Sequence, residues 1–337
     1  MKRMAVIIQI VGISIVIFIV DFLFIPSNNG SLLMGLLFWA AVGQGIIAIT
    51  AASDLARGEW GNEIRPQLLN YYPLLILFPV VFLIFSHDIT IYSWTEHPSG
   101  WLNPMFFIIR NTFLLLLPFI CAHFYAKSVW QGSTKKGFWA VTYLLIFVAS
   151  QSFMAFDIIM TFEYPWFSDL FGGYLFIESI YTGTAFTAIL TGILARRCDN
   201  KYRRPYNNFT LLMMAFALLW AGLFYAQYLT IWYGNLPEEV SFIAKRMQKP
   251  ILRIMGIYML LTMFLIPFCS LLSRRVKFYV PAVITIALLV FSGLFVERLI
   301  FLLPVANLSF VGVLLSLVLV GIPYIYLFLK QTVYCKG

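Results

Sequence analysis

The chain has 337 residues, of which 61% are hydrophobic and 11% are charged, and its mean hydropathy is +0.89. Soluble globular proteins carry about 25% charged residues, so this composition excludes a soluble protein. The net charge of +9 does not indicate nucleic-acid binding, because most Lys and Arg residues fall in alternate short loops between apolar runs. The scattered Cys residues form no CxxC or CxxCH pair, which excludes an iron–sulfur site and a covalently attached haem.

Apolar runs of about 20 residues recur along nearly the whole chain, and each is long enough to cross a membrane as a helix. The sequence therefore predicts an all-α integral membrane protein, organised as a single polytopic domain over residues 1–337. About ten transmembrane helices are expected, at residues 4–25, 31–53, 69–92, 104–127, 138–162, 171–195, 207–234, 250–273, 278–302 and 308–330. The first run is too long for a signal-peptide core and is expected to be retained.

The distribution of Lys and Arg predicts the orientation of these helices. Of the basic residues between helices, only Lys245, Arg246 and Lys249 fall on one side of the predicted membrane. By the positive-inside rule this side is external, and both termini are cytoplasmic.

Ionisable residues inside the predicted helices are the first candidates for a functional site, because a charge within a membrane is costly. The candidates are Asp157, Glu178, Arg110, Arg298, Glu297, Arg253 and His123. All except His123 lie toward the predicted external ends of their helices. Charges of both signs are thus expected near one membrane face.

Asp157 and Glu178 flank a short external loop, each about two helical turns from it. Each carboxylate either carries protons or is the structural partner of an Arg, because desolvation and a nearby cation act on its proton in opposite ways. Arg110 and Arg298 are expected to be countercharges. Glu297 and Arg298 point about 100° apart on a helix, so they need not pair with each other.

Haem ligation within the membrane is not expected. A membrane cytochrome b needs facing pairs of His, and only His123 lies inside a predicted helix, so a di-haem cytochrome b is excluded. His123 is either a hydrogen-bonded residue near the cytoplasmic interface or a proton relay. No metal site is predicted.

Two aromatic and acidic stretches lie at the predicted external surface. The segment IWYGNLPEE, residues 231–239, ends one helix and enters an acidic loop. It is either an interfacial aromatic belt followed by a loop, or a docking surface for an external partner. The docking candidates are Trp232, Glu238, Glu239 and Trp166.

Several of these stretches resemble one protein family. FDIIMTFEYPWFSDLFGGYLFIES, residues 156–179, resembles the signature region of ActF, a membrane subunit of alternative complex III, the bacterial quinol:electron-acceptor oxidoreductase. IWYGNLPEE, with Lys245 and Arg246 after it, is similar to the next recognisable stretch of that family. ERLIFLLP, residues 297–304, resembles the Glu-Arg motif of NrfD and polysulfide reductase membrane subunits, and FIIR ending at Arg110 also fits.

The resemblance implies an NrfD-like helical bundle, with its core at about residues 69–304, in a bacterial inner membrane. It implies a subunit that binds no redox cofactor, with quinone or quinol as its one possible ligand. Its partners would be an NrfD-like paralogous membrane subunit, an iron–sulfur subunit, multihaem cytochrome c subunits and lipid. Asp157 and Glu178 then become proton or quinol-site carboxylates in a subunit that is not catalytic alone.

Two other functions remain open at this point. A secondary transporter also has about ten helices and buried charges, although no inverted repeat or pair of Gly/Pro-broken helices is seen. A purely structural anchor would hold every buried charge in an ion pair.

Overall fold

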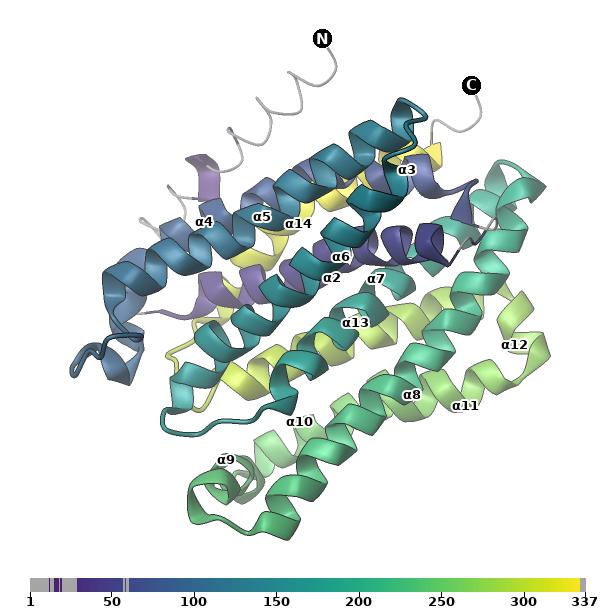
Figure 1. The fold of residues 1–337 in the computed structure, drawn as a ribbon. Coiled ribbons are helices and arrows are strands. Elements are labelled where there is room, and N and C mark those ends of the chain that lie inside the picture. Colours follow the sequence, from purple (N-terminus) through teal and green to yellow (C-terminus); the bar gives the residue numbers. More distant parts are fainter. Residues whose placement is uncertain are drawn as a thin grey trace.

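The computed structural model describes residues 12, 15–17, 19, 29–56, 58 and 61–333. Over these residues the chain is a bundle of long helices (Figure 1), and the only β pairing there is an isolated bridge between Asn29 and Asn307. Nine helical segments within them are long and apolar enough to cross a membrane: Ser31–Leu55, Arg65–Ile91, Pro104–Trp130, Lys136–Glu163, Leu170–Arg197, Asn200–Gly234, Pro250–Leu272, Val280–Leu302 and Phe310–Val333. The prediction of an all-α, multi-pass membrane protein is confirmed.

These nine segments match nine of the ten predicted helices, with ends that differ by a few residues. The remaining predicted helix, at residues 4–25, falls almost entirely outside the described residues.

Six of the segments contain one long α-helix each, and three are composite. The long helices are α2 (Ser31–Leu55), α5 (Pro104–Trp130), α7 (Leu170–Arg197), α8 (Arg203–Gly234), α13 (Val280–Leu302) and α14 (Phe310–Val333). The composite segments comprise α3 (Arg65–Leu69) with α4 (Leu77–Phe85), α6 (Lys136–Phe153) with the π-helix Met154–Ile159, and α10 (Pro250–Leu260) with the π-helix Leu261–Leu265 and α11 (Ile266–Leu272). A short helix, α12 (Arg274–Phe278), precedes α13.

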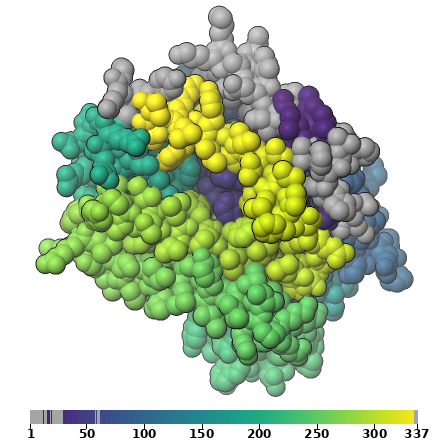
Figure 2. All heavy atoms as spheres, turned by 180° about the vertical axis from the view of Figure 1, so that it is seen from behind, coloured from purple at the N-terminus to yellow at the C-terminus, as the bar shows by residue number. Residues whose placement is uncertain are grey.

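The centre of the bundle is the pair α2 and α7. In an apolar stretch of 18 residues, 89% of the residues of α2 and 83% of those of α7 are buried. Small residues allow their backbones to approach closely, as is usual where membrane helices pack. A Cβ on Gly45 would meet the carbonyl oxygen of Ser179, and a Cβ on Gly183 would meet the backbone of Gly45. Seen from behind, the C-terminal helices cover the bundle and α2 shows only at the bottom of a hollow between them (Figure 2).

The acidic stretch after α8 is a helix and not the predicted loop. Helix α9 (Pro237–Gln248) begins with Pro237 in its first turn, has Glu238 and Glu239 beside it, and carries Lys245 and Arg246 in its last turn. This order of charges complements the helix dipole, which stabilises a short helix that local propensity alone leaves marginal. Figure 1 shows α9 at one end of the bundle, beyond the ends of α8 and α10, and we call this end the α9 end.

The basic residues gather at the opposite end. Gln331 near the end of α14 donates a hydrogen bond to the carbonyl oxygen of Gln67 in α3 (2.9 Å), so α14 ends beside the segment that follows α2. Arg65, Lys136 and Lys330 all lie in helical turns at this end.

Candidate functional site

A first group of charged side chains joins α7 to α13 near the α9 end. Tyr174, Glu178 and Tyr181 recur at spacings of four and three residues, which places them on one face of α7. Glu297 and Arg298 lie toward the end of α13. Contacts through Arg298 and Glu297 link Tyr174, Glu178, Glu297 and Arg298, and we call these four residues the Glu178 cluster.

Arg298 is the centre of this cluster. Its Nη2 lies 2.6 Å from Oε2 of Glu178, and its Nη1 lies 3.2 Å from Oε2 of Glu297. The hydroxyl of Tyr174 donates a hydrogen bond to Oε1 of Glu297. The charged side chains are at most 1% exposed. The two adjacent residues of α13 therefore do pair, because the long Arg298 side chain reaches both carboxylates.

The charges of the Glu178 cluster do not balance when both carboxylates are ionised, because two of them share one guanidinium. Among the described residues, Oε1 of Glu178 and Nε of Arg298 also have no hydrogen-bond partner. An uncompensated charge in a buried site is costly, and a carboxylate pair relieves that cost by sharing a proton. The arrangement is suited to binding and releasing one proton.

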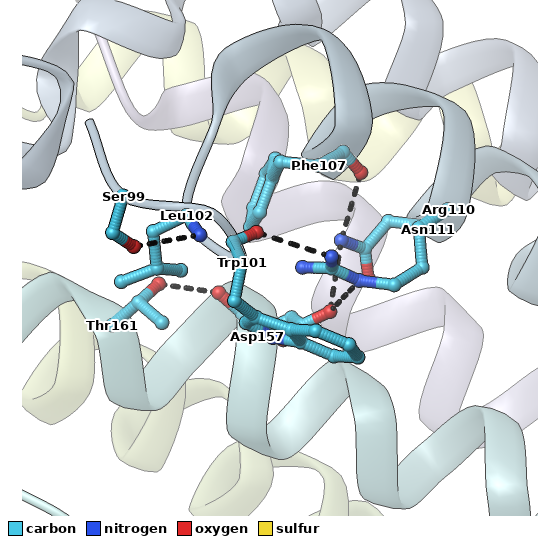
Figure 3. Close-up of polar contacts among 8 residues, drawn as sticks. All are labelled: Ser99, Trp101, Leu102, Phe107, Arg110, Asn111, Asp157 and Thr161. Atoms are coloured by element: carbon cyan, nitrogen blue, oxygen red, sulfur yellow. Dashed lines mark hydrogen bonds and ion pairs between the residues drawn. The ribbon is translucent and has the colours of Figure 1, made fainter.

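A second group of side chains surrounds Asp157 in the π-helix that follows α6. Nε of Arg110 lies 2.7 Å from Oδ2 of Asp157, and Nδ2 of Asn111 donates to the same oxygen (3.3 Å). Nε1 of Trp101 donates to Oδ1 (3.2 Å). Figure 3 shows Arg110 and Asn111 reaching this carboxylate from the same side. We call Trp101, Arg110, Asn111 and Asp157 the Asp157 cluster.

Local structure brings these residues together. Asn103 caps α5 by accepting a hydrogen bond from the backbone of Met105 (3.1 Å), which starts the helix that carries Arg110 and Asn111. The π-helix inserts an extra residue into each turn, which redirects side chains relative to a regular helix, and such turns are frequent at functional sites. Asp157 is thereby turned toward α5, and its side chain is 4% exposed.

A third ion pair ties α9 to the 3-10 helix Met160–Glu163, which follows the π-helix. Glu163 is 2.5 Å from Nη2 of Arg246 and 3.4 Å from Nζ of Lys245. The Arg246 guanidinium also lies 3.6 Å from the ring centre of Phe242. Burial lowers the pKa of Arg246, and the charge and hydrogen bond of Glu163 oppose that shift, so the group stays charged. The contact holds α9 against the bundle.

The four docking candidates differ in accessibility. Trp232 is 63% exposed, Glu238 is exposed and Glu239 is half-buried. Trp166 is buried, because its ring stacks on Phe242 of α9 with 3.8 Å between ring centres. Its aromatic surface is thus covered by the chain itself.

The other two candidate residues lie apart from the charged clusters. Nδ1 of His123 is 3.2 Å from the hydroxyl of Tyr72, and the two rings meet edge to face. Arg253 is exposed in the first turns of α10.

Sequence reasoning missed Trp101, Asn111 and Tyr174 as contacts of the buried charges. Asn111 follows Arg110 directly, and Tyr174 precedes Glu178 by one turn, so helical spacing from the charged residues would have found both. It also did not single out a group at the end opposite to α9. There Asp54 pairs with Arg65, lies 3.5 Å from Lys136 and accepts a hydrogen bond from Tyr125 (2.6 Å).

The fold and these clusters define a multi-pass helical membrane protein with buried carboxylate–Arg groups near one end of its helices. In the described part of the chain, no group of three or more His, Cys, Asp and Glu side chains is placed to hold a metal ion. No protein-family model matches the chain, and no curated protein matches it.

Proposed function

We propose that this chain is an NrfD-like membrane subunit of a quinol-oxidising respiratory complex, of the ActF type found in alternative complex III. In this role it anchors external iron–sulfur and c-haem subunits beside a paralogous membrane subunit, and it provides a proton pathway next to the site of quinol oxidation. The membrane is a bacterial inner membrane, with both termini cytoplasmic and the α9 end outside.

The observation that supports this proposal most directly is the composition of the Glu178 cluster. Two carboxylates share one guanidinium in a site where the charged side chains are at most 1% exposed. A structural ion pair needs only one carboxylate, whereas a second one makes the charge of the site depend on a bound proton. Quinol oxidation releases protons, and a buried group of this kind is suited to accept them.

The positions of the resembling motifs add support. The Glu-Arg motif at residues 297–304 contributes two members of the Glu178 cluster, and the stretch at residues 156–179 contributes Asp157, Tyr174 and Glu178. Both motifs thus supply buried charged groups near the same end of the bundle. The excess of basic residues at the opposite end supports the proposed orientation.

A structural anchor is the second candidate, and a specific observation favours it. Asp157 pairs with Arg110, and Glu163 pairs with Arg246, so these carboxylates each have a cation. Buried pairs of this kind hold helices in register without carrying protons.

The first test is purification of the complex through a tag on this chain, followed by a visible absorption spectrum and a quinol-oxidation assay. We expect c-type haem and quinol oxidation to accompany the chain, and the haem must come from partner subunits. A colourless, single-chain preparation would contradict the proposal and favour a transporter.

The second test replaces Glu178 with Gln in that complex. Because Arg298 keeps Glu297 as its partner, Glu178→Gln should assemble normally while quinol turnover falls about 100-fold, a typical loss when a proton-transferring group is removed. Asp169→Asn is the control, since it alters an exposed carboxylate directly before α7 that lies outside the Glu178 cluster, and it should retain turnover. Normal turnover in assembled Glu178→Gln, or loss of assembly, would support the structural anchor instead.

A further inference from the structure

The basic residues at the end opposite to α9 fall into two groups that differ in their partners. Arg65 and Lys136 lie beside Asp54 and share its carboxylate. Residues 196–204 and 274–277 contain eight further Lys and Arg residues and a single acidic residue. This second group therefore carries a large excess of positive charge.

The surroundings explain three of these eight cations. Arg196 and Arg197 lie in the last turn of α7, where the negative end of the helix dipole favours a cation. Nζ of Lys201 lies 3.7 Å from Oδ2 of Asp199. None of the other five forms an ion pair with a residue that the structure describes. We call these five the α8–α12 patch, and they are Arg203, Arg204, Arg274, Arg275 and Lys277.

A hydrogen bond between α8 and α12 gathers the patch on one surface. The hydroxyl of Tyr206, in the first turns of α8, donates to the carbonyl oxygen of Lys277 in α12 (2.8 Å). The other four patch residues are exposed, and each lies within three positions of one of these two residues. Figure 1 shows α12 at the end of the bundle where α7 is followed by α8. Cations from two distant parts of the chain are thus neighbours.

The position of these cations is unfavourable for the helix that carries two of them. Arg203 and Arg204 begin α8, and no side chain caps this end of the helix. The positive end of the helix dipole repels cations, and neighbouring cations repel one another. The positive-inside rule requires basic residues on this side of the membrane, but it does not require them at the start of a helix. A bound anion relieves both costs, because helix N-termini and Arg side chains bind phosphate.

An exposed apolar strip leads away from the patch on each of two helices. On α8, Leu211 and Leu218 follow Arg204 at seven-residue spacing, so the three lie on one face, and the two Leu are 43% and 51% exposed. On the segment that ends in α11, Leu265 and Leu272 are 47% and 57% exposed, and the patch residues of α12 come directly after them. Helices α8 and α11 pack against each other. Two neighbouring apolar strips therefore both end at cations.

We propose that the α8–α12 patch binds the head group of an anionic phospholipid, whose acyl chains lie on the strips of α8 and α11. The phosphate oxygens accept hydrogen bonds from the guanidinium groups, and the negative charge compensates the unpaired cations. A free anion would leave the apolar strips without a role, and so would an acidic protein in the aqueous phase. The site requires only an anionic membrane leaflet and does not depend on the proposed function.

The test measures binding of phosphatidylglycerol to the purified full-length chain, by native mass spectrometry from detergent micelles. Arg204→Gln with Arg274→Gln removes a cation next to each strip. This double variant should bind the lipid about 25-fold more weakly, because each Lys or Arg near a membrane surface contributes about fivefold. Lys127→Gln with Lys135→Gln is the matched control, since it removes two exposed cations at the same end but outside the patch, and it should leave the affinity unchanged.

Three further measurements identify what the patch recognises. Arg204→Lys with Arg274→Lys keeps both charges and should retain most of the affinity. Phosphatidylcholine has a neutral head group and should bind the Gln double variant as well as it binds the unaltered chain. Excess inorganic phosphate should not displace phosphatidylglycerol, because it makes no contact with the strips.

Several outcomes would overturn the proposal. Unchanged phosphatidylglycerol binding by the Arg204→Gln, Arg274→Gln variant would reject a lipid site and favour an acidic protein as the partner. An equal loss in the Lys127→Gln, Lys135→Gln control would show that any cation at this end serves as well. An equal loss of phosphatidylcholine binding would show that charge is not recognised, and displacement by inorganic phosphate would assign the patch to a free anion.

Discussion

The Glu178 cluster and the Asp157 cluster contain the same kinds of side chain but differ in charge balance and in cover. The Glu178 cluster has two carboxylates for one Arg and lies between α7 and α13, with its charged groups at most 1% exposed. The Asp157 cluster has one carboxylate for one Arg, and a half-exposed Trp101 covers it. Two buried carboxylate–Arg groups of the same membrane protein can therefore differ both in net charge and in exposure.

The difference separates two uses of a buried charge. Where the carboxylates outnumber the cations and water is excluded, a bound proton is the means of neutralising the site. Where one carboxylate and one cation balance, as in Asp157 and Arg110, the pair is neutral without a bound proton. Variants of the two Arg residues test this comparison most severely.

The largest effect is expected for Arg298→Met. It leaves Glu178 and Glu297 buried without a cation, which should lower the free energy of unfolding by about 3–5 kcal/mol. The measurement is SDS-induced unfolding of the purified chain, followed by tryptophan fluorescence. Arg253→Met is the control, since Arg253 is exposed, and it should change stability by less than about 0.5 kcal/mol. A stable Arg298→Met chain would contradict the central role of this cation.

A smaller effect is expected for Arg110→Met in the same assay. Asp157 keeps its hydrogen bonds from Asn111 and Trp101, and these partly compensate for the lost cation. We expect a loss of about 2 kcal/mol, below the range for breaking a fully buried pair. Equal losses of unfolding free energy for the two Arg variants would show that the difference in burial between the two clusters has no effect on stability.

The smallest effect is expected for Tyr174→Phe, which removes the hydrogen bond to Glu297 but keeps the ring. We expect a loss of about 1.5 kcal/mol, at the lower end of the range for a hydrogen bond to a charged acceptor, and this loss should exceed that of a neutral bond. Tyr181→Phe provides the comparison on the same face of α7, because the Tyr181 hydroxyl donates to the carbonyl oxygen of Met263 (2.8 Å). Equal losses for the two Tyr variants would mean that Glu297 is neutral and that the shared proton lies on it.

The sequence by itself determined the class of the protein and the position of nine of its membrane segments. Apolar runs of membrane length depend on composition alone, so their ends could be placed to within a few residues of those in the structure. The candidate charges were also identified from the sequence, because a charged residue within an apolar run stands out without any knowledge of its neighbours.

Only the tertiary structure decided which charges meet and what covers them. Glu178 and Arg298 are 120 residues apart, and their pairing depends on the packing of α7 against α13. The turn of Asp157 toward α5 depends on a π-helix, and the cover over it comes from Trp101 in a loop 56 residues away. Helix α9 was missed because its 12 residues are too short and too polar to form a membrane-length apolar run. Contacts with Glu163 and Trp166 hold it in place. Local patterns report length and polarity, whereas partners and burial arise from contacts between segments distant in the chain.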